Sequence, residues 1–139
     1  MPPLQDDATI DPDQSLIRAP RPGWTATRED GTERPNRLAF VDGRTQEASC
    51  FIDNDTNLAE LRRLFPGDKI CRFAARFARD AGFVIQRKPG DCPPGFVGDP
   101  VHHLVIGPAE EKPKKALLRM GDALALTPGI EILPPAADE

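Results

Sequence analysis

The sequence predicts a single small α+β domain with an antiparallel or mixed sheet and about three helices, preceded by a proline-rich arm. Its 139 residues suffice for one domain with a core of ordinary size. Short apolar segments alternate with Gly- and Pro-containing turns, which favours strands joined as hairpins. Segments of helical periodicity lie between these strands, and the 16 prolines indicate much irregular chain.

The first 36 residues are predicted to form the arm. They are rich in Pro, Asp, Arg and Thr, and the stretch APRPGW at 19–24 favours neither a helix nor a sheet strand. Only SLIR at 15–18 is compatible with a short strand. We therefore expect an extended arm over 1–36 and an α+β domain over 37–135. We expect part of the arm to pack against the domain through the side chains of Leu16, Ile17 and Trp24.

The domain is predicted to open with two strands in the segment RLAFVDGRTQEASCFID at 37–53. An Asp-Gly pair at 42–43 is a strong turn signal between them. In the second strand, at 48–52, the period of two puts Ser49 and Phe51 on the same face. One face of this strand is core, so Ser49 is either buried with Phe51 or lines a cleft beside it.

Two helices are predicted next. The first begins at Asn57, which has capping-box spacing to Glu60. The second covers 68–81, where apolar residues recur at helical spacing. Its apolar face comprises Ile70, Phe73, Ala74, Phe77 and Ala81, and its other face carries Arg72, Arg76 and Arg79. These arginines form either a solvated face or a surface for an acidic partner.

The last third of the chain is predicted to hold two strands, a helix and an edge strand. The strands are FVIQR at 83–87 and VHHLVI at 101–106, with a Pro- and Gly-rich loop between them. Pro113 fits the first turn of the helix, and IEIL at 130–133 fits the edge strand. The predicted order after the arm is therefore β-β-α-α-β-β-α-β.

Charge and composition restrict the partners. The net charge of −4 and the absence of a long single-sign run argue against a nucleic-acid partner. No apolar segment approaches the roughly 20 residues that span a bilayer, and the acidic N-terminus is not that of a signal peptide. Three widely spaced cysteines, an odd number, favour reduced thiols in a cytoplasm. They are Cys50, Cys71 and Cys92.

The two histidines stand side by side at the start of a predicted strand. Strand geometry puts His102 and His103 on opposite faces, so only one of them can line a given site. An imidazole titrates near neutral pH and can act as an acid, a base or a hydrogen-bond partner, although a structural role is the alternative. A metal site with Cys92 lacks a compact Cys pair, and we expect no metal.

Other nucleophile and phosphate motifs are absent from the sequence. Ser49 is not part of a G-x-S-x-G elbow, and Cys50 has no recognisable catalytic neighbourhood. The stretch GFVGDP at 95–100 is not a phosphate-binding loop.

The block GFVIQRKPGDCPPG…HLVIGP resembles the C-terminal half of small bacterial toxins of the type VI secretion system that have an ADP-ribosyltransferase-like fold. EASCFID is similar to their Thr-Ser-Val-Phe-Asp segment, and SLIR to their opening Leu-aromatic-Arg strand. The resemblance implies that Ser49 and His103 are the catalytic residues. It implies that Arg18 binds the cofactor, NAD, by facing its cleft.

Two functions are therefore expected. The first is an ADP-ribosyltransferase-like toxin or bacterial defence component that acts in the cytoplasm and uses NAD. The alternative is a non-enzymatic interaction protein, such as an immunity protein, an adaptor or an accessory subunit. It would bind a protein partner through the arm and the arginine-lined helix. Convergence of Arg18, Ser49 and His103 on one cleft would favour the enzyme.

Overall fold

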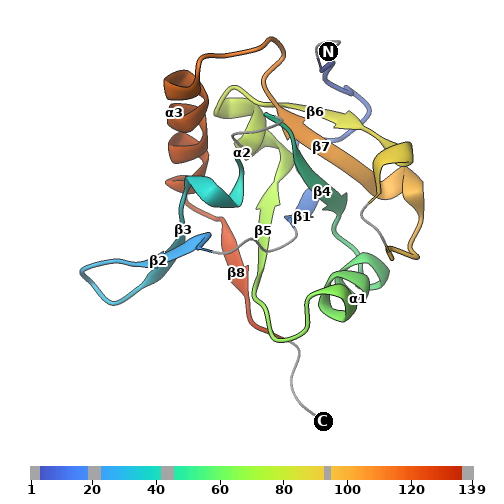
Figure 1. Cartoon of the computed structure of the whole chain (residues 1–139), viewed down its shortest axis with the longest axis horizontal. Helices are drawn as coiled ribbons and strands as arrows, with labels where there is room; N and C mark the ends of the chain where they lie inside the picture. Colours follow the sequence, from blue (N-terminus) through green and yellow to red (C-terminus); the bar gives the residue numbers. More distant parts are fainter. Residues whose placement is uncertain (1–3, 19–22, 42–45, 93–94, 136–139) are drawn as a thin grey trace.

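The computed structural model describes residues 4–18, 23–41, 46–92 and 95–135, and it shows the predicted α+β fold (Figure 1). Six strands form one sheet in the order β6-β7-β4-β1-β5-β8, and every neighbouring pair is antiparallel. A second sheet pairs β2 with β3. The strands are β1 (Ser15–Arg18), β2 (Thr25–Thr27), β3 (Glu33–Pro35), β4 (Ala48–Ile52), β5 (Ile70–Ala74), β6 (Val84–Arg87), β7 (His103–Gly107) and β8 (Glu131–Leu133). The helices are α1 (Asp55–Leu64), α2 (Ala75–Asp80) and α3 (Lys114–Ala125), with 3₁₀ turns η1 (Arg37–Ala39), η2 (Pro89–Asp91) and η3 (Pro100–His102).

The predicted arm differs from the structure at its only predicted strand. β1 lies in the centre of the sheet between β4 and β5, and Leu16 and Ile17 are fully buried on its two faces. A short apolar run of this kind fits a strand that is covered on both faces. Residues 15–18 are therefore part of the α+β domain. Trp24 is buried as expected, and the β2–β3 hairpin projects from the domain (Figure 1).

Hairpin connections are rarer than predicted. Among the described strands of the main sheet, only two successive pairs are neighbours in the sheet, β6 with β7 and β1 with β4, and the β2–β3 hairpin separates β1 from β4 along the chain. The central position of β1 is the reason, because β4 and β5 flank it although they follow it much later in the sequence. The chain must therefore cross over the sheet between most successive strands.

The strand predicted to precede the Asp-Gly turn is the 3₁₀ turn η1. The side chain of Asn36 accepts a hydrogen bond from the Leu38 amide at 2.8 Å and so caps this turn. Ala39 and Phe40 are buried in the larger core cluster, whereas Leu38 is exposed. The Asp-Gly pair at 42–43 lies outside the described residues.

The helix predicted over 68–81 is wrong in its first half. Residues 70–74 form β5, and only Ala75–Asp80 form a helix. Cys71 and Phe73 point into the larger core cluster, whereas Ile70 belongs to the smaller one. The apolar residues of 70–74 thus fit a period of two as well as a helical period, and pairing with β1 and β8 decides for the strand.

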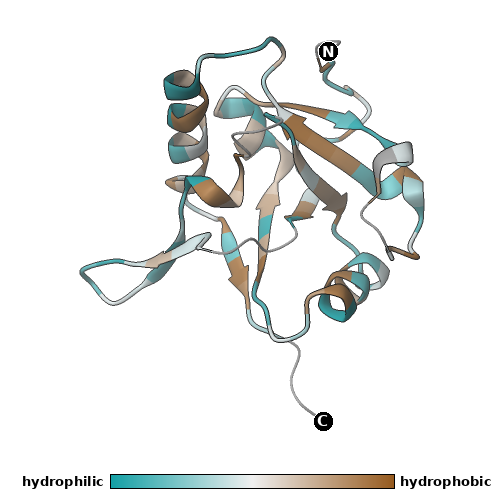
Figure 2. Cartoon of the chain, viewed as in Figure 1, coloured by the Kyte–Doolittle hydropathy of each residue, from teal (hydrophilic) through white to brown (hydrophobic). Residues whose placement is uncertain are grey.

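Apolar side chains cover both faces of the main sheet. The larger cluster lies between the sheet and α2, α3 and η1, and it includes Leu16, Phe40 and Phe73. The smaller cluster lies under α1 and contains Ile17, Phe51, Leu61 and Ile70. Figure 2 shows β7 apolar along most of its length, which agrees with its position inside the sheet. Asn54 caps α1, three residues before Asn57, the predicted cap.

Candidate functional site

Ser49 and His103 meet on one face of the main sheet. In the antiparallel register of β4 and β7, Ser49 lies opposite Val105 and Phe51 lies opposite His103. Residues two apart on a strand share a face, so these four side chains lie together. The Nε2 atom of His103 is 3.1 Å from the Oγ atom of Ser49. The structure therefore brings the two predicted catalytic residues into hydrogen-bond contact.

The main-chain carbonyl of Lys88 sets the orientation of the His103 ring. Its oxygen is 2.6 Å from Nδ1 of His103, and a carbonyl oxygen can only accept a hydrogen bond. Nδ1 therefore carries the proton in the neutral imidazole, and Nε2 is left with a lone pair. It follows that the Ser49 hydroxyl donates its hydrogen to Nε2.

The two members of the pair differ in exposure. His103 is fully buried, and its ring lies 5.2 Å from that of Phe51, whereas Ser49 is partly exposed. Ser49 is therefore the member of the pair that contributes exposed surface, and the imidazole lies behind it.

A partly buried ion pair lies on the same face. The Nζ atom of Lys88 is 3.0 Å from both carboxylate oxygens of Glu47. Glu47 is two residues before Ser49, and the main-chain amide of Lys88 donates to the carbonyl of His103. This pair was not predicted. The period of two in β4 could have placed Glu47 beside Ser49, but Lys88 was assigned to a loop.

Arg18 lies on the other face of the sheet, so the prediction that it shares a cleft with Ser49 and His103 is wrong. It pairs in register with Cys50 and Cys71, and strand alternation puts Cys50 and Ser49 on opposite faces. Its Nε atom donates to the carbonyl of Ala39, and one terminal nitrogen donates to the carbonyl of Ser49, both at 3.0 Å. Arg18 is therefore buried among main-chain acceptors.

Burial disfavours the thiolate form of the cysteines on either side of Arg18. It raises the pKa of Cys50 to about 12, against an opposing effect of the Arg18 charge. Burial also raises the pKa of Cys71. Both thiols stay protonated near neutral pH, and a thiol is a poor nucleophile compared with a thiolate.

His102 lies outside the Ser49 site. The strand begins at His103, and His102 ends the 3₁₀ turn η3, which Asp99 caps through a hydrogen bond from the Val101 amide. Its Nδ1 atom is 3.2 Å from the side-chain nitrogen of Asn57, which is fully buried near the start of α1. His102 therefore connects η3 to α1 through this contact.

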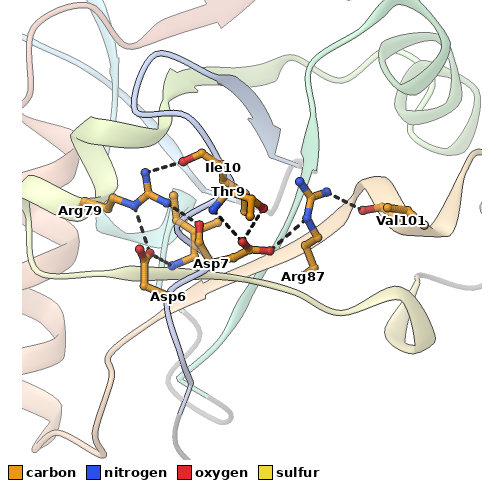
Figure 3. Close-up of polar contacts among 8 residues, drawn as sticks. Asp6, Asp7, Thr9, Ile10, Arg79, Arg87 and Val101 are labelled. Carbon is orange, nitrogen blue, oxygen red and sulfur yellow. Dashed lines mark hydrogen bonds and ion pairs between the residues drawn. The ribbon is translucent and has the colours of Figure 1, made fainter.

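The arginines predicted to form a partner surface bind other parts of this chain. Arg79 pairs with Asp6 at 3.0 Å and donates to the carbonyls of Asp7 and Ile10, as Figure 3 shows. Arg76 pairs with Asp13. Arg72 is on β5 rather than on the helix. The contacts of Arg76 and Arg79 attach the N-terminal segment, residues 4–14, to α2.

A hollow of about 620 Å³ lies between the same N-terminal segment and β6. Lys88 lines it, whereas Ser49 and His103 do not. The residues around it are Leu4, Gln5, Asp6, Asp7, Ala8, Gln86 and Lys88.

Comparison of the chain with protein families, curated proteins and solved structures found no match in any of the three. Within the described ranges, no three side chains of His, Cys, Asp or Glu come together as metal ligands. In the same ranges, every helix is too short or too polar to cross a membrane.

Proposed function

We propose that the chain is an ADP-ribosyltransferase-like toxin or bacterial defence component that acts in the cytoplasm on NAD, with Ser49 and His103 as its working groups. The observation that supports this proposal is the hydrogen bond between Ser49 and His103. These residues are 54 positions apart in the sequence, and the resemblance selected both independently of any structure.

The proposal assigns new roles to two basic residues. Arg18 is a structural residue, because its guanidinium is buried on the opposite face and binds main-chain carbonyls. Lys88 is a cation on the Ser49 face, and it binds the pyrophosphate of NAD by exchanging the Glu47 carboxylate for phosphate oxygens. The hydroxyl of Ser49 binds a ribose hydroxyl and is held in place by His103.

The test measures host growth during expression and nicotinamide release from NAD by the purified protein. Ser49→Ala and His103→Asn are expected to restore growth and to reduce nicotinamide release at least about 100-fold, the lower end of what a positioned acid–base group contributes. Ser15→Ala is the matched control and is expected to behave as the parent. Equal toxicity and turnover in Ser49→Ala and the parent would overturn the proposal.

The alternative, a non-enzymatic interaction protein, loses the surfaces that it was expected to use. Residues 15–18 of the arm lie in the sheet, and the arginines of α2 bind the N-terminal segment. What favours this alternative is the projecting β2–β3 hairpin, whose residues are largely exposed (Figure 1). A protein partner that binds this hairpin, in a chain without NAD turnover, is the outcome that would select it.

A further inference from the structure

We infer that Ser49 is a covalent nucleophile that reacts with electrophilic acyl groups such as esters, that His103 is its general base, and that the main-chain carbonyl of Lys88 orients that base. The inference uses the same residues as the proposed function but does not depend on NAD. It assigns to Ser49 a chemistry that hydrogen bonding to a ribose does not require.

Ser49, His103 and the Lys88 carbonyl follow one another in the order that activates a serine. Serine nucleophiles are activated by a base within hydrogen-bond reach, and the base is oriented by a third group on its other nitrogen. Here the Oγ–Nε2 distance is 3.1 Å and the distance from Nδ1 to the Lys88 oxygen is 2.6 Å. The carbonyl holds the ring in the tautomer that accepts the proton of Ser49. It thus serves the orienting role that a carboxylate serves in Ser-His-Asp triads.

Ser49 and His103 also differ in exposure. His103 has no exposed surface, whereas Ser49 is partly exposed. Ser49 is therefore the member of the pair that an electrophile meets first, and the base lies one hydrogen bond behind it. Phe51 packs against the imidazole at 5.2 Å and keeps it in place behind the hydroxyl. A base held within hydrogen-bond reach of a partly exposed serine is the arrangement that a serine nucleophile needs.

The proposed reaction balances without a cofactor. As Oγ forms a bond to the ester carbonyl carbon, its proton passes to Nε2 of His103. When the bond from that carbon to the alcohol oxygen breaks, Nε2 gives the proton to the departing alkoxide. Water then attacks the acyl-serine, loses a proton to Nε2 and releases the acid, and the proton returns to Oγ.

The chain contains its own reference group for a test. Ser15 is the only other serine in the sequence. Its hydroxyl donates to the Oδ2 atom of Asp53 at 2.8 Å, and the same oxygen is 2.8 Å from Nε of Arg72. A carboxylate paired with a guanidinium is a weak base, so Ser15 is expected to be unreactive. Both serines lie on strands of one sheet, so their labelling rates can be compared directly within the folded protein.

The experiment treats the whole chain with an alkyl fluorophosphonate and maps the modified residue by peptide mass. Oγ would bond to phosphorus, fluoride would leave, and the proton would pass to His103. The expected label is on Ser49, absent in Ser49→Ala, unchanged in Ser15→Ala and at least about 100-fold slower in His103→Asn. That variant keeps an amide donor for the Lys88 carbonyl, and a circular-dichroism melt tests whether it is folded.

Labelling of Ser49 no faster than Ser15 in the parent would overturn the inference, and this comparison requires no variant to fold. Equal labelling rates of folded His103→Asn and the parent would also overturn it. The outcome is separate from the proposed function. A labelled protein that does not consume NAD contradicts only the NAD proposal, and one that consumes NAD with Ser49 unlabelled contradicts only the nucleophile.

Discussion

The two faces of the main sheet use polar residues in opposite ways. On the face under α2 and α3, Arg18 is buried, donates to main-chain carbonyls and lies between two thiols that burial keeps protonated. On the other face, Ser49 is partly exposed with a buried imidazole behind it. The comparison teaches that neighbouring residues of one strand can have opposite environments, since Cys50 is buried whereas Ser49, adjacent to it in β4, is partly exposed.

The largest expected effect is on the stability of the face under the helices. Phe73 is 1% exposed and packs edge-on against Phe40 with ring centroids 5.4 Å apart. Phe73→Ala is expected to lower the free energy of unfolding by about 3–5 kcal/mol, because it leaves a cavity in a close-packed core. Urea denaturation measures the loss.

Phe77→Ala is the matched variant for that measurement. Phe77 is only partly buried at the edge of the same cluster, so the loss is expected to be smaller. Equal losses for the two phenylalanines would mean that β5 and α2 are not oriented as described.

The second largest effect is expected at Arg18, where the loss of stability can be measured separately from the reactivity of Ser49. Arg18→Met keeps most of the side-chain volume but removes the donors to Ala39 and Ser49. We expect a loss of about 2–3 kcal/mol in unfolding free energy, because buried carbonyls lose charged donors. The fluorophosphonate labelling rate of Ser49 in the folded variant is expected to match the parent. A folded Arg18→Met protein with normal Ser49 labelling but no NAD turnover would contradict this structural role and indicate that Arg18 binds the cofactor.

The smallest effect concerns the N-terminal segment. Hydrogen bonds from Thr9, with a smaller contribution from Arg87, lower the pKa of Asp7. A carboxyl whose pKa is lowered by folding stabilises the folded state above its unfolded pKa, and this contribution disappears as the pH falls. Asp7→Ala is expected to cost less than about 1 kcal/mol at pH 7, because the ion pair is partly exposed.

The pH dependence of this difference is the check. Chemical denaturation of Asp7→Ala and the parent should give a gap in unfolding free energy that begins to narrow near the unfolded pKa of about 4 and shrinks further as the pH falls through the lowered folded pKa. A gap as large at pH 2.5 as at pH 7 would show that Asp7 acts through packing rather than charge. Labelling of Ser49 should be unaffected, since Asp7 lies in the N-terminal segment.

The sequence predicted the fold class and the shared face of Ser49 and Phe51, because strand alternation is a local property. It could not place Arg18, since the face of a side chain relative to a site depends on which strand pairs with β1 and in what register. At 70–74 the apolar pattern fits two periods, so tertiary pairing decided the structure. The part played by Lys88 was missed because it depends on a main-chain carbonyl, which no residue type reveals.

The tautomer of His103 tests the central claim most directly, since the claim is that Ser49 donates to an imidazole oriented by a carbonyl. Long-range ¹H–¹⁵N correlation spectra of the folded protein distinguish the two ring nitrogens, and His102 provides a second imidazole for reference. We predict a proton on Nδ1 and a lone pair on Nε2 of His103, with an Nε2 resonance that shifts in Ser49→Ala while Nδ1 stays unchanged. A proton on Nε2, or an Nε2 resonance that is indifferent to Ser49→Ala, would contradict the account.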